Sequence, residues 1–142
     1  MKGNGNQPGA PRNNENASIL YIEDNQDNRK LVKRVLQAAG FHVHGVADGP
    51  TGFEYLQTHT PDLILMDIHL PGTDGYTLTR QLRQSEQFAA VPIITLTANV
   101  TKEDEQKSQE AGANGFIHKP INVDSLPDQI RTYLAENERG RP

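Results

Sequence analysis

The chain alternates between two patterns of hydrophobic and polar residues. The first consists of short apolar segments bounded by turn residues, which we interpret as strands at 19–22, 41–46, 63–67, 92–96 and 115–118. In the third of these, four apolar residues follow one another without polar alternation, which is typical of a strand buried on both faces of a parallel sheet. Residues 68–75 contain one Pro and two Gly and are predicted to be a loop.

The second pattern has the spacing of an amphipathic helix and occupies the segments that follow the strands. It predicts helices at about 27–39, around 53–56, at about 75–84 and 101–111, and from about 125 onward. The inward faces are predicted to be Leu31, Val32, Val35, Leu36 and Ala39 in the first helix, Phe53 and Leu56 in the second, Leu78 and Leu82 in the third, and Leu126, Ile130, Tyr133 and Leu134 in the last.

The predicted fourth helix differs from the others because it has almost no apolar face. Thr101 and Asp104 have the spacing of a capping box, and Gly112 follows the last turn. Between these limits, Ala111 is the only apolar residue from 102 to 111. A helix of this length takes most of its stability from packing, so we expect it to be the weakest of the five and a moving element.

Strands that alternate with helices predict an α/β fold with a parallel sheet and right-handed crossovers. The length of 142 residues suits one domain. Residues 1–17 are rich in Asn, Gly and Pro and are predicted to be a disordered tail, because they bury too little apolar surface to offset their ordering entropy. The folded domain is expected to span 18–138, with a frayed end at 139–142.

Composition narrows the class of protein. The formal net charge is −4 and no basic stripe is present, which argues against nucleic acid as a direct partner. The chain has no cysteine, which excludes disulfides, thiolate metal sites and a Cys nucleophile. Because no segment has the length of a membrane span or the core of a signal peptide, we expect a soluble cytoplasmic protein without membrane contact.

Polar residues stand at the ends of four predicted strands. Glu23 and Asp24 follow the first strand, Asp67 ends the third, Thr97 follows the fourth and Lys119 follows the fifth. In open α/β sheets, ligands bind outside the carboxyl ends of the strands, which all lie at one edge. The sequence therefore predicts that acids, a hydroxyl and a lysine converge at that edge.

This set of groups suits phosphoryl chemistry. Three carboxylates in one crevice repel one another and require proton sharing or a cation, and oxygen ligands favour Mg²⁺, with Mn²⁺ as a substitute. An aspartate can itself be the nucleophile, and the resulting acyl phosphate carries about two negative charges. Magnesium, the Lys119 ammonium and the Thr97 hydroxyl are the groups needed to hold its oxygens.

Four motifs together resemble the receiver domain of two-component response regulators. They are Glu23-Asp24-Asn25, the segment 65–75 around Asp67, Leu96-Thr97-Ala98 and the segment 115–120 that contains Lys119. The resemblance covers Ser18 to about Glu138 in the order and spacing of the family. It implies a flavodoxin-like doubly wound sheet of five strands in the order 2-1-3-4-5 with five helices.

The resemblance also implies a role for each residue. Asp67 would accept a phosphoryl group from a histidine kinase or a histidine phosphotransfer protein. The metal would be bound by Asp24 directly, by Glu23 through water, by Asp67 and by the backbone carbonyl of His69. Thr97 and Lys119 would hold the phosphoryl oxygens, Phe116 would move when Thr97 is drawn inward, and His69 and Asn99 would tune dephosphorylation.

Such a protein is not an enzyme with a separate substrate, since it would catalyse only its own phosphorylation and dephosphorylation. Its output would be altered binding of a downstream protein. The alternative within the family is an interaction module whose output does not depend on phosphorylation. The sequence leaves open the cognate kinase, the output target, the oligomeric state, the phosphoryl lifetime and whether the domain stands alone.

Functions from other classes fit less well. A flavodoxin-type FMN module needs a phosphate-cradling loop after the first strand, where this chain has Glu-Asp-Asn-Gln-Asp. A haloacid-dehalogenase-type phosphatase expects a second Asp two residues after the nucleophile, where this chain has His69. His42 and His44 share one face of a predicted edge strand, and we interpret them as a solvated edge and not as a metal site.

Overall fold

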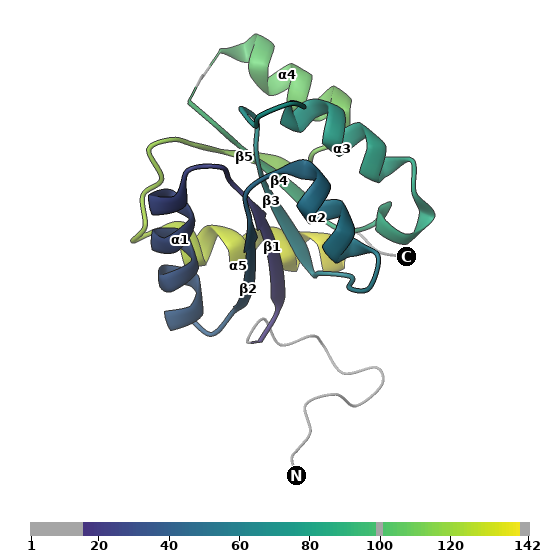
Figure 1. The fold of residues 1–142 in the computed structure, drawn as a ribbon. Helices are drawn as coiled ribbons and strands as arrows, with labels where there is room; N and C mark the ends of the chain where they lie inside the picture. The colour runs from purple at the N-terminus through teal and green to yellow at the C-terminus, as the bar shows by residue number, and fades with distance from the viewer. Residues whose placement is uncertain (1–15, 99–100, 140–142) are drawn as a thin grey trace.

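The computed structural model describes residues 16–98 and 101–139, the last two without their side chains. The five strands are β1 (Ser18–Ile22), β2 (His42–Val46), β3 (Leu63–Asp67), β4 (Ile93–Thr97) and β5 (Gly115–His118). The helices are α1 (Gln26–Ala38), α2 (Gly49–Leu56), α3 (Gly75–Arg83), the 3₁₀ turn η1 (Glu86–Phe88), α4 (Lys102–Ala111) and α5 (Leu126–Arg139). All neighbouring strands are parallel, in the order β2-β1-β3-β4-β5 (Figure 1). The predicted fold is confirmed.

The sheet carries a hydrophobic cluster on each face, because successive side chains of each strand point to opposite sides. On one face, Ile19, Leu65 and Leu96 pack with residues of α1 and α5. On the other face, the neighbouring residues Leu20 and Ile64 pack with residues of α2 and α3. Figure 1 shows the same two layers of helices, with α4 lying beside α3. The central strands are therefore buried on both sides, as the unbroken apolar run in β3 predicts.

Polar caps fix the helix boundaries. The side chains of Asn25, Asp48, Asp74 and Thr101 each accept a hydrogen bond from a backbone N–H in the first turn of the helix that follows. Gly112 has a φ of 105° and ends α4 in the left-handed conformation. The capping prediction for Thr101 and the end before Gly112 are confirmed.

Two predictions about burial are wrong. Leu31 is 47% exposed, although the spacing of apolar residues places it on the inner stripe of α1; Val32 and Leu36, four residues apart, form the buried contact instead. Ala17 is 2% exposed and belongs to the core, so the predicted tail does not extend to this residue. The rest of that tail, residues 1–15, lies outside the described residues. Within the described ranges, no helix is both long enough and apolar enough to span a bilayer.

Candidate functional site

Asp67 lies at the carboxyl end of β3, between the ends of β1 and β4. Its side chain is 97% buried, and the backbone N–H of His69 donates to its Oδ1 at 3.2 Å. The order of the strands reverses between β1 and β3, and that reversal is where open α/β sheets form their binding crevice. Gly75 allows the loop between β3 and α3 to return close to Asp67, because a Cβ at this position would come within 2.6 Å of the Asp67 carbonyl oxygen.

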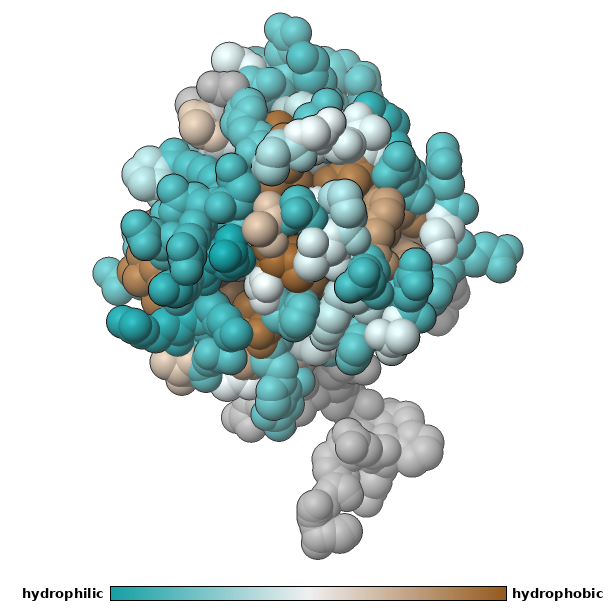
Figure 2. Space-filling view, in the orientation of Figure 1, coloured by the Kyte–Doolittle hydropathy of each residue, from teal (hydrophilic) through white to brown (hydrophobic). Residues whose placement is uncertain are grey.

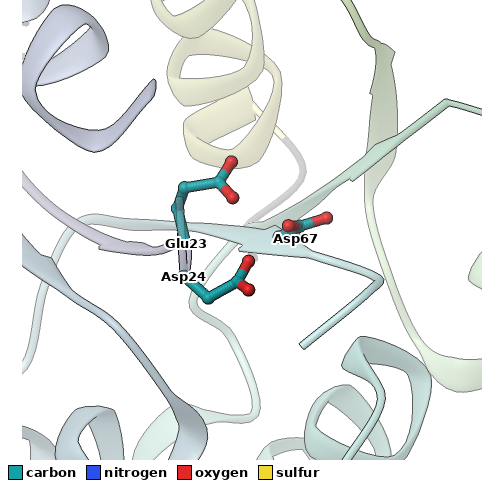
Figure 3. Close-up of side chains that lie close together, drawn as sticks. All are labelled: Glu23, Asp24 and Asp67. Carbon is teal, nitrogen blue, oxygen red and sulfur yellow. The ribbon is translucent and has the colours of Figure 1, made fainter. Parts of the chain in front are cut away.

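Three carboxylates meet at this point. Glu23, Asp24 and Asp67 each offer an oxygen, and these three oxygens lie within 4.8 Å of one another (Figure 3). Glu23 is 1% exposed and Asp67 is 2% exposed, whereas Asp24 is open to solvent. Hard oxygen ligands at this spacing fit a divalent cation such as Mg²⁺, and the exposed Asp24 leaves room for its waters. The predicted convergence of these acids is confirmed by the geometry.

Lys119 provides the positive charge at the site. Its Nζ lies 2.9 Å from Glu23 Oε1 and 3.1 Å from Asp67 Oδ2. Burial lowers the pKa of the Lys119 ammonium, but its hydrogen bonds and charge interactions with Glu23 and Asp67 outweigh that effect, so the pKa is raised above its ordinary value. The ammonium therefore remains charged at neutral pH and bridges the two buried acids.

Two residues that the sequence motifs did not single out support Glu23. The buried Tyr21 hydroxyl donates to Glu23 Oε1 at 3.1 Å. The Arg29 guanidinium donates to the Glu23 backbone carbonyl at 2.7 Å, with its side chain lying against Gly45 of β2. The sequence signal for Tyr21 is limited to its position, since residues two apart in a strand share a face and Tyr21 stands two residues before the first acid of the site.

The remaining predicted residues lie around this centre. Thr97 is buried at the end of β4, and its carbonyl accepts from the Lys119 backbone N–H at 2.8 Å. Phe116 is half-buried in β5, with its ring 5.6 Å from that of His118. His69 is exposed beside Asp67, and the metal-binding role of its carbonyl stays a prediction. Asn99 lies outside the described residues.

The two histidines of β2 lie at an exposed sheet edge, as predicted. His42 and His44 are both exposed, and β2 is the outer strand of the sheet. The His44 ring stacks on that of Tyr55 at 4.0 Å, and Tyr55 stacks on His59 at 4.2 Å. These side chains therefore cover the edge strand with rings from α2 and the loop that follows it.

Comparisons with known proteins agree on one family. The family model for the response regulator receiver domain matches residues 19–131. The polar-differentiation response regulator DivK of Brucella ovis is 34% identical over 119 residues, which cover 84% of this chain and 97% of that protein.

Solved structures give the same result. The receiver domain of a Pseudomonas aeruginosa sensor histidine kinase, solved with magnesium coordinated in its active site cleft, is 35% identical with a TM-score of 0.77 and covers 84% of this chain and 98% of that one. The chemotaxis response regulator CheY4 of Vibrio cholerae is 29% identical with a TM-score of 0.80 and covers 83% and 98%, respectively.

Proposed function

The chain belongs to the family of response regulator receiver domains, and from this premise we propose that Asp67 is its phosphoacceptor. The observation that carries the proposal is the convergence at Asp67 of two further carboxylates, from the segment after β1, and one ammonium group, from the segment after β5. Asp67 is the acid of this cluster that ends a central strand, and both of its oxygens have hydrogen-bond donors that fix their direction.

The proposed step is transfer of a phosphoryl group from a phosphohistidine. An Asp67 carboxylate oxygen attacks the phosphorus, the bond from phosphorus to the imidazole nitrogen breaks, and its electron pair returns to that nitrogen. The product is an acyl phosphate that carries about two negative charges at a buried position, in place of the single charge of the carboxylate. The Lys119 ammonium, 3.1 Å from Asp67 Oδ2, is placed to neutralise part of this charge.

Glu23, Asp24 and Asp67 are the residues that would hold Mg²⁺, or Mn²⁺ in its place. When bound, the metal supplies positive charge against the transferred oxygens. Thr97 holds a phosphoryl oxygen through its hydroxyl, and Phe116 follows the inward movement of Thr97. His69 and Asn99 stand two residues after Asp67 and Thr97 and tune hydrolysis of the acyl phosphate.

The partners are a histidine kinase or a histidine phosphotransfer protein as donor and a downstream protein as target, all in the cytoplasm. The chain catalyses only its own phosphorylation and dephosphorylation. An interaction module that works without phosphorylation is the second candidate, and it gives no reason for three acids, two of them buried, to be held together beside a lysine.

Labelling by a small phosphodonor tests the proposal. Acetyl phosphate with Mg²⁺ should phosphorylate the wild-type chain, and the Asp67→Asn variant should lose the label, as measured by intact-protein mass spectrometry. Asp74→Asn is the matched control, because Asp74 is an exposed cap of α3 and Asn caps a helix equally well. Asp74→Asn should label like the wild type. Undiminished labelling of Asp67→Asn would refute the assignment.

A further inference from the structure

We infer that Tyr21 is a positioning residue that releases Lys119 from Glu23 for the phosphoryl group. The inference rests on the proposed phosphoryl transfer to Asp67 and goes beyond it by assigning a task to a residue that acts on the site only through Glu23. Tyr21 is fully buried in β1, and its hydroxyl ends 3.1 Å from Glu23 Oε1.

Glu23 depends on a small set of donors because it is almost completely buried. Its Oε2 accepts from the Asn25 backbone N–H at 3.2 Å. Its Oε1 accepts both the Tyr21 hydroxyl and the Lys119 ammonium, the latter at 2.9 Å. Tyr21 and Lys119 therefore share one acceptor oxygen.

Lys119 has two tasks that compete. In this structure it bridges Glu23 and Asp67, and after phosphorylation it has to neutralise the new oxygens on Asp67. When the ammonium turns toward those oxygens, Glu23 Oε1 loses a charged donor inside the protein. A buried carboxylate oxygen without a donor is costly, and the Tyr21 hydroxyl remains in place to satisfy it.

Tyr21 is suited to this task because its hydroxyl already donates to Glu23 Oε1 and its ring is buried in the core. The ring packs in the cluster shared with α1 and α5, which fixes the direction of the hydroxyl. Phenylalanine would retain that packing and remove only the donor.

The test separates metal binding from phosphoryl binding in Tyr21→Phe. Magnesium alone brings no phosphoryl oxygens that would draw Lys119 from Glu23, so the Mg²⁺ dissociation constant should change by no more than about twofold, as measured by calorimetry. Beryllofluoride, a phosphoryl mimic, draws Lys119 away, so its dissociation constant at saturating Mg²⁺ should rise about tenfold, the cost of one hydrogen bond to a charged group. Tyr55→Phe, which removes a hydroxyl at the distant sheet edge, should change neither constant.

Each outcome decides the inference. Equal losses in the two titrations would mean that Tyr21→Phe distorts the acidic cluster, and unchanged beryllofluoride binding would mean that the hydroxyl has no role; either result overturns the inference and leaves Asp67 as the acceptor. A wild-type chain that binds Mg²⁺ without binding beryllofluoride would instead contradict the proposed function itself. Thermal unfolding of Tyr21→Phe, expected to remain cooperative, verifies that the variant is folded.

Discussion

The helices α5 and α4 both pack beside the last two strands of the sheet, but they are held in different ways. Helix α5 buries Leu126, Ile130 and Leu134 in the cluster that also contains residues of β3 and β4. Helix α4 buries only Ser108 and Ala111 of its ten residues. The surface at the top of Figure 2, where α4 lies, is correspondingly hydrophilic. Apolar burial therefore holds α5 to the sheet, whereas α4 buries little apolar surface.

Hydrogen bonds take the place of apolar contacts under α4. The Ser108 hydroxyl lies 3.0 Å from the Thr95 hydroxyl of β4, and both side chains are buried. At the other end, Arg83 of α3 donates to the Gly112 carbonyl at 2.8 Å. Hydrogen bonds contribute less net stability than apolar burial of comparable size, and they depend strongly on direction. We therefore expect α4 to shift at lower cost than α5.

The acidic site and α4 also differ in the tasks that we propose for them. The β1 and β3 strands that carry the acidic site share a cluster with α1 and α5, so the site rests on well-packed elements. Helix α4 follows the loop after Thr97 and leads into β5, which carries Phe116. It joins the two residues that we propose respond to phosphorylation. A well-packed site beside a weakly held helix suits a protein in which a phosphoryl group at the site would alter the surface around α4.

The largest effect is expected from Ile130→Ala in α5. Ile130 is fully buried, and removing its side chain leaves a cavity in the cluster, so the free energy of unfolding should fall by about 2–5 kcal/mol. Chemical denaturation measures this loss. The matched substitution Thr132→Ala on an exposed position of α5 should change stability by less than about 0.5 kcal/mol. A small loss at Ile130 would remove the contrast between the two helices.

A smaller effect is expected from Ser108→Ala in α4. The substitution leaves the Thr95 hydroxyl with only a long contact of 3.4 Å to the Gly115 carbonyl, so the free energy of unfolding should fall by about 1–2 kcal/mol. Adding Thr95→Val should restore most of that loss, because an apolar pair leaves no unsatisfied group. If the double variant is less stable than Ser108→Ala alone, the hydroxyl pair is not what holds α4 to the sheet.

The smallest global effect is expected from Thr101→Ala, which removes the N-cap of α4. Its Oγ1 accepts from the Asp104 backbone N–H at 3.1 Å, and losing such a cap costs about 1 kcal/mol. Because α4 is weakly held, the cost should fall on local opening of its first turn, seen as faster amide exchange there, with little change in the global midpoint. If amide protection fell equally in all helices, α4 would open only together with the whole fold, and the prediction would be wrong.

The sequence predicted the parts of this molecule that depend on local pattern. The unbroken apolar run of β3, the Thr101 cap and the Gly112 end follow from residue spacing, and the topology then places Asp67 and Lys119 together across 52 residues of chain. Leu31 shows where that reasoning ends. Spacing gives the width of an apolar stripe, but the rotation of α1 on the sheet decides which edge of the stripe is buried.

Tyr21 marks a second limit. Its position two residues before Glu23 was visible, but a tyrosine in an apolar strand is ordinary core unless its hydroxyl has a partner. Only the three-dimensional structure shows that the Tyr21 hydroxyl and the Lys119 ammonium both contact Glu23 Oε1. Side-chain hydrogen bonds of this kind depend on rotamers and packing and cannot be predicted from strand periodicity.

Hydrogen exchange with and without beryllofluoride tests most directly whether the weakly held helix responds to the site. In the wild type with Mg²⁺, amides of residues 106–111 should exchange faster than those of residues 32–36 in the well-packed α1, and they should slow when beryllofluoride is added. In the Asp67→Asn variant, residues 106–111 should still exchange faster than residues 32–36, but beryllofluoride should no longer slow their exchange. If residues 106–111 are as protected as residues 32–36 and do not respond to beryllofluoride, α4 is part of the rigid scaffold and the account is wrong.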